Sequence, residues 1–167
     1  MPFKQAAYLP QKELIQYLKG NGFKVFISTH DTADFVRPFS EELYGVPEEN
    51  VIGSSFKYQY DKSRNSLVRL PEPAFVNTKE GKAYSLEMMT GKHPIFTVGN
   101  IGTGEDVYML RYSQGSKYPN YQLLIRHDDP DREFAYGNKD NLSEEWAKKY
   151  NWKILSMKKD WKTIFTQ

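Results

Sequence analysis

The amino-acid sequence predicts an α/β fold: a mostly parallel sheet with flanking helices and one β-hairpin. Short apolar, β-branched runs alternate with segments of helical periodicity along the chain, and this alternation is typical of parallel sheets. Two of the runs lead into polar or glycine-rich segments, and ligands bind beyond the carboxyl ends of strands in such sheets. The length of 167 residues suits one domain, so we expect a single domain over residues 1–167.

The N-terminal part predicts a helix, a strand and a second helix. Residues 11–20 are amphipathic, with Leu14 and Leu18 on one face and an Asn-Gly stop after them. Residues 24–29 are an apolar, β-branched run that ends in a hydroxyl residue, and helical periodicity resumes over 32–44. A turn is expected where this strand meets the second helix.

The middle of the chain predicts a hairpin, and the rest predicts further strands and one helix. Residues 51–60 and 67–70 are strand patterns on either side of a polar turn, and the Pro-Glu-Pro at 71–73 is expected to end the hairpin. A helix is predicted after the hairpin, and strands follow it; the segments are 83–89 for the helix and 94–98, 121–126 and 152–157 for the strands.

Two positions suit the binding of a phosphate group. Thr29 places a hydroxyl near a helix N-terminus, where the dipole and free backbone N–H groups favour an anion. The alternative is that Asp31 or Thr32 simply caps the helix. Lys82, at the start of the predicted helix 83–89, would offset the charge of a phosphoryl group, unless it is only a solvated lysine. Lys79 is a nearby alternative for the same role.

A glycine-rich loop follows the strand predicted at 94–98. It contains one amide and two acids, at Asn100, Glu105 and Asp106. Carboxylate and amide oxygens at the end of a parallel strand are suitable ligands for Mg²⁺. The loop therefore predicts the metal side of a site.

Several ordered segments together resemble a known family. Residues 34–39 and 41–53, the Arg-Glu-Phe-Ala-Tyr segment at 132–136 and the Asp-Trp-Lys-Thr-Ile-Phe segment at 160–165 are similar to phosphoserine-phosphatase-like hydrolases of the haloacid dehalogenase (HAD) superfamily. The resemblance covers nearly the whole chain. It implies a HAD-like, Rossmann-like fold and Mg²⁺-dependent hydrolysis of a small phosphorylated molecule through a phosphoaspartate.

The resemblance also implies a role for each candidate residue. Thr29 and Lys82 match the two catalytic positions of the second and third motifs, and both would bind phosphate together with His30. The metal-side positions match Asn100 and Asp106, with Glu105 adjacent. The loop is longer here than in the family, so which acid faces the metal stays open.

The first motif of the family, Asp-x-Asp-x-Thr, is absent from this sequence. Residues 1–28 contain no Asp, and their one acid is Glu13. Because that motif supplies the carboxylate nucleophile, we expect no phosphatase activity from this chain alone and weak Mg²⁺ binding. The resemblance implies that the first strand and the cap are missing. The missing strand would lie between the strands ending at Thr29 and Gly99, so these two either pair directly or leave exposed edges.

Three hypotheses follow from these observations. The chain is the C-terminal part of a phosphatase and is inactive alone; or it is a non-catalytic phosphate-binding or interaction domain; or another chain completes its active site. Exposed strand edges would also favour self-association.

Composition and two His-Asp pairs bear on other possible functions, namely nucleic-acid binding, membrane association and His-Asp phosphohydrolase activity. A net charge of +2 does not indicate a nucleic-acid partner, and a basic C-terminal end most simply forms a solvated face. The absence of Cys and of long apolar runs predicts a cytoplasmic protein with no membrane partner. The pairs His30-Asp31 and His127-Asp128 follow strand patterns, whereas His-Asp phosphohydrolases gather such residues on helices.

Overall fold

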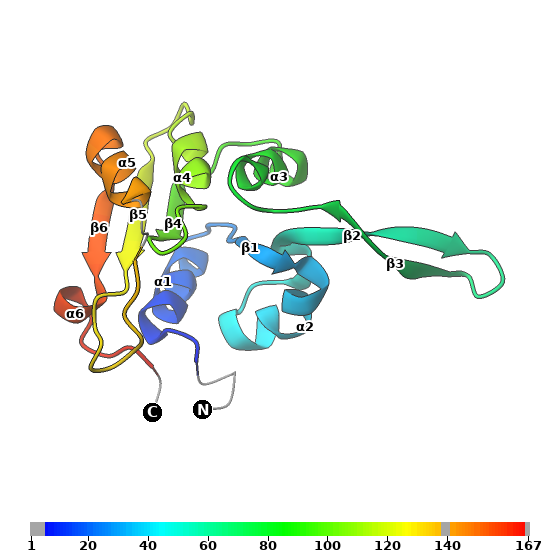
Figure 1. Ribbon diagram of the computed structural model, residues 1–167, viewed down its shortest axis with the longest axis horizontal. Coiled ribbons are helices and arrows are strands. Elements are labelled where there is room, and N and C mark those ends of the chain that lie inside the picture. The colour runs from blue at the N-terminus through cyan, green and yellow to red at the C-terminus, as the bar shows by residue number, and fades with distance from the viewer. Residues whose placement is uncertain (1–5, 138–140, 166–167) are drawn as a thin grey trace.

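The computed structural model describes residues 6–137 and 141–165 and is an α/β structure with helices flanking parallel and mixed sheets (Figure 1). This confirms the α/β class, the flanking helices and the parallel pairing predicted from the sequence. The elements in order are α1 (Leu9–Gly20), β1 (Ile27–Thr32), α2 (Ala33–Tyr44), the 3-10 turn η2 (Glu48–Asn50), β2 (Val51–Asp61), β3 (Ser66–Phe75), α3 (Glu80–Thr90), β4 (Phe96–Asn100), α4 (Val107–Ser113), β5 (Tyr121–Arg126), α5 (Leu142–Tyr150), β6 (Lys153–Ser156) and α6 (Met157–Asp160).

The strands form two separate three-stranded sheets. One has the order β1-β2-β3, with β1 parallel and β3 antiparallel to β2. The other has the order β4-β5-β6 and is parallel throughout, with Phe96 opposite Tyr121 and Leu123 opposite Lys153. Within the described residues β1 pairs only with β2, and β4 pairs only with β5. Of the two outcomes expected for these strands, the structure has exposed edges and no direct pairing.

The predicted hairpin is confirmed as β2 and β3, and it projects away from the rest of the molecule (Figure 1). The expectation that the prolines end it was wrong, because β3 continues to Phe75. β3 is an edge strand, and its register with β2 shifts where Phe56 faces Pro73. Prolines are tolerated at edges and at such irregularities because no ladder hydrogen bond is lost there.

Two further boundaries differ from the predictions. β1 runs through Thr32 directly into α2, and its pairing with β2 is irregular between Ser28 and Thr32 where a turn was expected. α3 begins at Glu80, so Lys82 lies in its first turn. The predicted helix began only at residue 83 because glycine at position 81 disfavours a helix. In the structure a Cβ on Gly81 would lie 2.7 Å from the carbonyl oxygen of Val76, so close packing requires glycine there.

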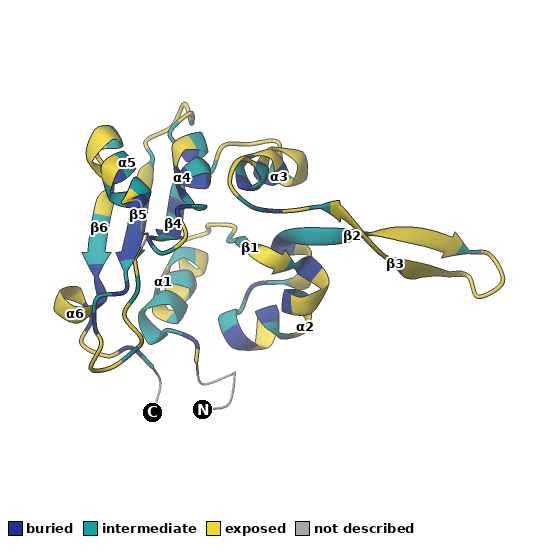
Figure 2. Ribbon diagram, in the orientation of Figure 1, coloured by how far each residue is buried: buried dark blue, intermediate teal, exposed yellow. Residues whose placement is uncertain are grey.

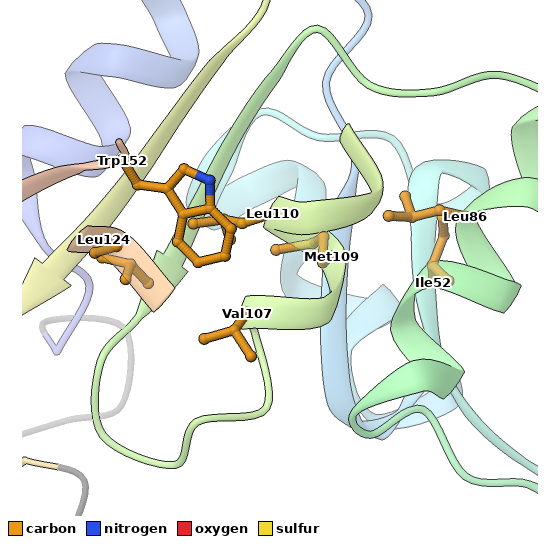
Figure 3. Packing of buried hydrophobic residues seen from close by; sticks show 8 residues of the cluster. Ile52, Leu86, Val107, Met109, Leu110, Leu124 and Trp152 are labelled. Atoms are coloured by element: carbon orange, nitrogen blue, oxygen red, sulfur yellow. The ribbon is translucent and has the colours of Figure 1, made fainter. Parts of the chain in front are cut away.

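The main core surrounds α4 and joins the two sheets. Figure 3 shows Leu86 and Ile52 on one side of α4, and Leu124 and Trp152 on the other. Leu110 of α4 lies between them and is fully buried. Since burying a leucine side chain stabilises a fold by about 1.5–3 kcal/mol, α4 is the main apolar link between the sheets.

A second cluster holds α1 to the C-terminal segment. Tyr8, just before α1, forms an isolated bridge with Phe165, and its ring lies 5.5 Å from that of Trp161. No residue of α1 itself is buried. Among the described residues, no helix is both long enough and apolar enough to span a membrane.

Candidate functional site

A buried ion pair lies at the carboxyl end of β4. The Lys82 ammonium group donates to Asp106 Oδ1 at 2.6 Å, and the two side chains are only 7% and 13% exposed. The second oxygen of Asp106 accepts from the backbone N–H of Asn100 at 2.7 Å. Asp106 therefore fixes Lys82, from the first turn of α3, against the last residue of β4.

Glycine at position 99 lets this pair form. A Cβ there would lie 2.7 Å from Asp106 Cβ and 2.8 Å from a methyl carbon of Leu110. Both contacts are too close for a real side chain, so α4 approaches β4 closely only because residue 99 lacks one. Close packing of α4 against β4 therefore explains the glycine at position 99, just before the loop.

The end of β1 lies next to the loop that follows β4. Thr29 Oγ1 accepts from the backbone N–H of Asp31 at 3.1 Å. His30 is exposed, and its Nδ1 lies 3.5 Å from Glu105 Oε2. The carboxyl ends of β1 and β4 therefore meet at one place, although the two strands do not pair.

Asn77 connects the end of β1 to α3 and was not identified from the sequence. It is fully buried, donates through Nδ2 to the Thr29 carbonyl oxygen at 2.7 Å, and accepts through Oδ1 from the Ser85 hydroxyl at 2.6 Å. Its own N–H donates to Ser54 Oγ. Because Ser85 lies one turn after Lys82, Asn77 holds the helix that carries Lys82 against the strand that carries Thr29. The sequence carries no local signal for this role, because the predicted strand ended at residue 70.

The amide of Asn100 is used within the loop. Its Oδ1 accepts from the Gly102 N–H at 2.6 Å, and its Nδ2 donates to the Tyr136 hydroxyl at 2.7 Å. The Tyr136 ring stacks on His127 and lies where a Cβ on Gly102 would be. Burial raises the pKa of Tyr136, while the hydrogen bond from Asn100 acts in the opposite direction. The 132–136 segment thus supplies a residue that supports the loop.

The oxygen ligands expected for Mg²⁺ are engaged by other groups of the chain. Asp106 accepts with both oxygens, Asn100 Oδ1 accepts from the loop backbone, and Glu105 faces His30. In the part of the chain that the structure describes, no group of three or more His, Cys, Asp or Glu side chains is arranged to hold a metal. Because Mg²⁺ requires several hard oxygen ligands in near-octahedral geometry, these residues alone do not fit the ion.

A cavity of about 1430 Å³ lies beside the site. Thr29, Asp31 and Asp106 are among its lining residues, whereas Lys82 is not. The remaining walls come from α1, β1, β4 and the C-terminal part of α3, and we call this cavity the inter-sheet slot.

The candidate residues thus fall into contacting groups. The first joins Lys82, Asp106 and Asn100, and the second joins His30 and Glu105. Thr29 is connected to α3 through Asn77. Lys79 is exposed and has a positive φ of 49° at the start of α3. Of the two lysines considered, only Lys82 is buried within the site.

Comparison with protein-family models finds no matching family, and comparison with curated proteins finds no match. The function is therefore argued from the geometry of the site.

Proposed function

We propose that this chain provides the phosphate-binding part of a HAD-type phosphatase site and that, alone, it binds a small phosphorylated molecule without hydrolysing it. The observation that carries the proposal is the buried Lys82–Asp106 pair at the carboxyl end of β4, with Thr29 within β1 and lining the same cavity as Asp106. The HAD-like identity of the fold is part of the same proposal.

Lys82 is suited to hold a phosphoryl oxygen. An ammonium group has three donors, and Asp106 takes one of them at 2.6 Å. The other two would meet an anion at the 7% of the side chain that is exposed, because Lys82 is not among the residues that line the slot. A cation held in a poorly hydrated place acts more strongly on a nearby anion than it would in water. Asp106 keeps the ammonium group in position at the end of β4.

Thr29 and His30 complete the anion site from the β1 side. The Thr29 hydroxyl accepts from the Asp31 N–H, so its own proton is free to be donated to a phosphoryl oxygen. His30 is exposed beside Glu105 and supplies a second donor at the mouth. The negative charges of Asp31, Glu105 and Asp106 repel an anion and offset the attraction of Lys82. We therefore expect free phosphate to bind in the millimolar range, about −4 kcal/mol.

Hydrolysis requires a nucleophile that this chain does not offer at the site. Residues 1–28 contain no Asp, and Asp106 is committed to Lys82 and the Asn100 backbone. Loss of a catalytic nucleophile lowers the rate by up to about a millionfold. We therefore expect no turnover of p-nitrophenyl phosphate, with or without added Mg²⁺. Turnover that co-purifies with the chain and disappears in Lys82→Gln would contradict this expectation.

The binding proposal is tested by titrating inorganic phosphate and O-phosphoserine and following the ³¹P resonance or the heat released. Thr29→Val and Lys82→Gln should each weaken binding at least about tenfold, the effect of ~1.4 kcal/mol. Lys79→Gln is the matched control, because it removes an exposed lysine three residues away.

Thr29→Val also guards against unfolding, since the contact of Asn77 is to the Thr29 backbone and survives the substitution. The proposal fails if both site variants bind phosphate like the wild type, or if Lys79→Gln loses as much affinity as they do.

A further inference from the structure

The outer part of the β2-β3 hairpin has no neighbouring strand on either side among the described residues. β1 is paired with β2 only as far as Ser54, opposite Thr32, and the sheet ends at β3. Residues 57–60 and 62–69 are exposed, and the hairpin extends beyond α2 (Figure 1). An isolated two-stranded ribbon is only marginally stable in water. The hairpin is therefore a place where a further strand would add stability.

One face of the hairpin is aromatic. Phe56, Tyr58 and Tyr60 are alternate residues of β2, so their side chains lie on the same face. Arg69 of β3 lies opposite Tyr58, and its guanidinium group is 3.9 Å from the centroid of the Phe56 ring. The Tyr58 and Tyr60 side chains remain 43% and 54% exposed. A strand added beside β2 would therefore meet aromatic rings on this face.

The other face carries opposite charges placed symmetrically about Gln59. Lys57 lies two residues before Gln59 and Asp61 lies two residues after it. Lys57 donates to Glu72 of β3 at 2.6 Å and is still 56% exposed. Asp61 uses Oδ1 in the hairpin turn, and its Oδ2 is 3.7 Å from Arg64 Nε, which is too long for a hydrogen bond. Both charges can therefore accept a further partner.

Two copies of this edge are complementary about a two-fold axis. An axis perpendicular to the sheet relates two antiparallel strands and keeps every side chain on its own face. If Gln59 of one copy faces Gln59 of the other, Lys57 of each copy lies opposite Asp61 of the other. In the same register Tyr58 lies opposite Tyr60. Pairs of opposite charge and pairs of aromatic rings directly across a ladder stabilise it.

The outer edge of β3 is not complementary to itself in this way. Its two charged residues lie on opposite faces, because Arg69 contacts Phe56 whereas Glu72 binds Lys57. No register about a two-fold axis can therefore place them opposite each other. The prolines of β3 also lack the N–H that a ladder requires. Of the two free edges, β2 is the one that fits a second copy of the chain.

We propose that the protein forms a symmetric dimer in which the β2 edges of two hairpins pair antiparallel, centred on Gln59, into one four-stranded sheet. The strand order is β3-β2-β2-β3, and the paired segment runs over residues 57–61. Only the edge is covered, so Leu67 on β3 stays exposed. The dimer uses neither the β1 edge nor the β4 edge, and it does not rest on phosphate binding.

The tip of each hairpin then lies toward the end of β1 in the second copy. In this register the turn of one hairpin comes near Ser54 of the other, where the pairing with β1 stops. Two exposed cations lie in the turn, and two exposed acids lie around the end of β1; they are Lys62 and Arg64, and Asp31 and Asp34. Charges of opposite sign therefore meet here as well.

Sedimentation equilibrium of the wild-type chain measures the dimer itself. We expect a dissociation constant of about 10–100 μM, because the paired segment is short. A chain that is still monomeric at about 1 mM would overturn the proposal. That result would leave the hairpin edge to a strand of another protein.

A single introduced cysteine locates the axis, since the chain has none of its own. Gln59→Cys places two thiols opposite each other, where facing Cβ atoms lie about 4.5–5.5 Å apart, and mild oxidation should link most of the protein into dimers. Val68→Cys is the matched control, because Val68 is exposed and lies opposite Gln59 on the same face of the hairpin. In the dimer the two copies of Val68 are three strand spacings apart, about 14 Å, and should stay unlinked. Equal crosslinking of the two variants would overturn the proposal.

Exchanging the charges tests the register. Lys57→Asp alone places two acids opposite Asp61, and Asp61→Lys alone places two cations opposite Lys57, so each variant should dimerise at least about tenfold more weakly. An equimolar mixture of the two variants restores both opposite-charge pairs and should dimerise within about threefold of the wild type. A mixture as weak as the separate variants, or a dimer that Lys57→Asp does not weaken, would overturn the pairing centred on Gln59. Asp61 also caps the turn, and the Gln59→Cys test leaves that cap intact.

Discussion

The two sheets of this protein differ in how fully they are covered. In the β4-β5-β6 sheet the central strand β5 buries four consecutive residues and lies between two parallel neighbours. In the β1-β2-β3 sheet β1 has no buried residue, and beyond Phe56 both arms of the hairpin are almost entirely exposed (Figure 2). The β4-β5-β6 sheet is covered like the interior of an α/β domain. The β1-β2-β3 sheet depends on α3 and α4 for its connection to the core.

The region that contributes most to stability is therefore different from the region that contains the candidate site. The apolar contacts that hold the molecule together lie around α4 and β5. The candidate site and the slot lie beside this core at the edge strands β1 and β4, and β1 has no buried residue. Elements with little buried contact area are those that open or bind partners most readily.

The largest effect is expected at the ion pair that links the two regions. Lys82→Met leaves Asp106 buried without its cation and should lower the free energy of unfolding by about 3–5 kcal/mol. The double variant Lys82→Met, Asp106→Leu should recover most of that loss, because a pair of apolar side chains needs no partner. Urea denaturation of the three proteins measures this. A double variant as unstable as the single one would show that the pair is not what joins α3 to β4.

The next effect contrasts one leucine from each sheet. Leu124 in β5 is fully buried, and Leu67 in β3 is 65% exposed. Leu124→Ala should cost about 2–5 kcal/mol, whereas Leu67→Ala should change stability by no more than about 0.5 kcal/mol. Thermal unfolding followed by circular dichroism compares them. Similar losses in both would mean that the hairpin packs against something in solution.

A smaller effect is expected at Asn77. Asn77→Ala leaves the Thr29 carbonyl and the Ser85 hydroxyl without their partner, which should cost about 1–3 kcal/mol. It should also weaken phosphate binding, since it loosens α3 against β1. Ser63→Ala in the exposed hairpin turn is the control. Phosphate affinity unchanged in a folded Asn77→Ala protein would remove Asn77 from the positioning role.

The smallest effect is a dependence of stability on pH, and it is expected next to the β4-β5-β6 sheet, at Asp128. Burial raises the pKa of Asp128, but hydrogen bonds from Ser156 and from the Lys158 backbone outweigh it, so the net pKa is lowered. A carboxyl group whose pKa is lower in the folded state contributes stability above its unfolded pKa of about 3.9. That contribution is lost as the pH falls through the folded value. Wild-type protein should therefore lose more stability below about pH 4 than Asp128→Asn does, as read from urea midpoints across that range.

The sequence anticipated those parts of the fold that depend on local pattern. The strand at 121–126 has the predicted bounds because its centre, Leu123 to Ile125, is a short apolar run followed by polar residues, and the hairpin was recognised from its polar turn. The end of β3 was missed because the proline rule assumes a paired neighbour, whereas β3 is an edge. No helix was assigned to α5, whose polar residues conceal Leu142, Trp146 and Tyr150 spaced one turn apart.

The site was anticipated only in part, for a similar reason. Lys82, Thr29 and the 100–106 loop were identified as candidates from motif order, and the structure brings Lys82, Asn100 and Asp106 into contact. Asn77 and Tyr136 could not be given roles, because each acts through contacts with residues far away in the sequence. Long-range contacts of single polar side chains leave no periodic signal.

Amide hydrogen exchange along β4 tests the open edge between the two sheets most directly. If β4 is bonded only to β5, the N–H groups of Thr97 and Gly99 should be protected, and those of Phe96 and Val98 should exchange quickly. Strong protection of all four amides would contradict an open edge, because it would show that the β4 edge already has a partner.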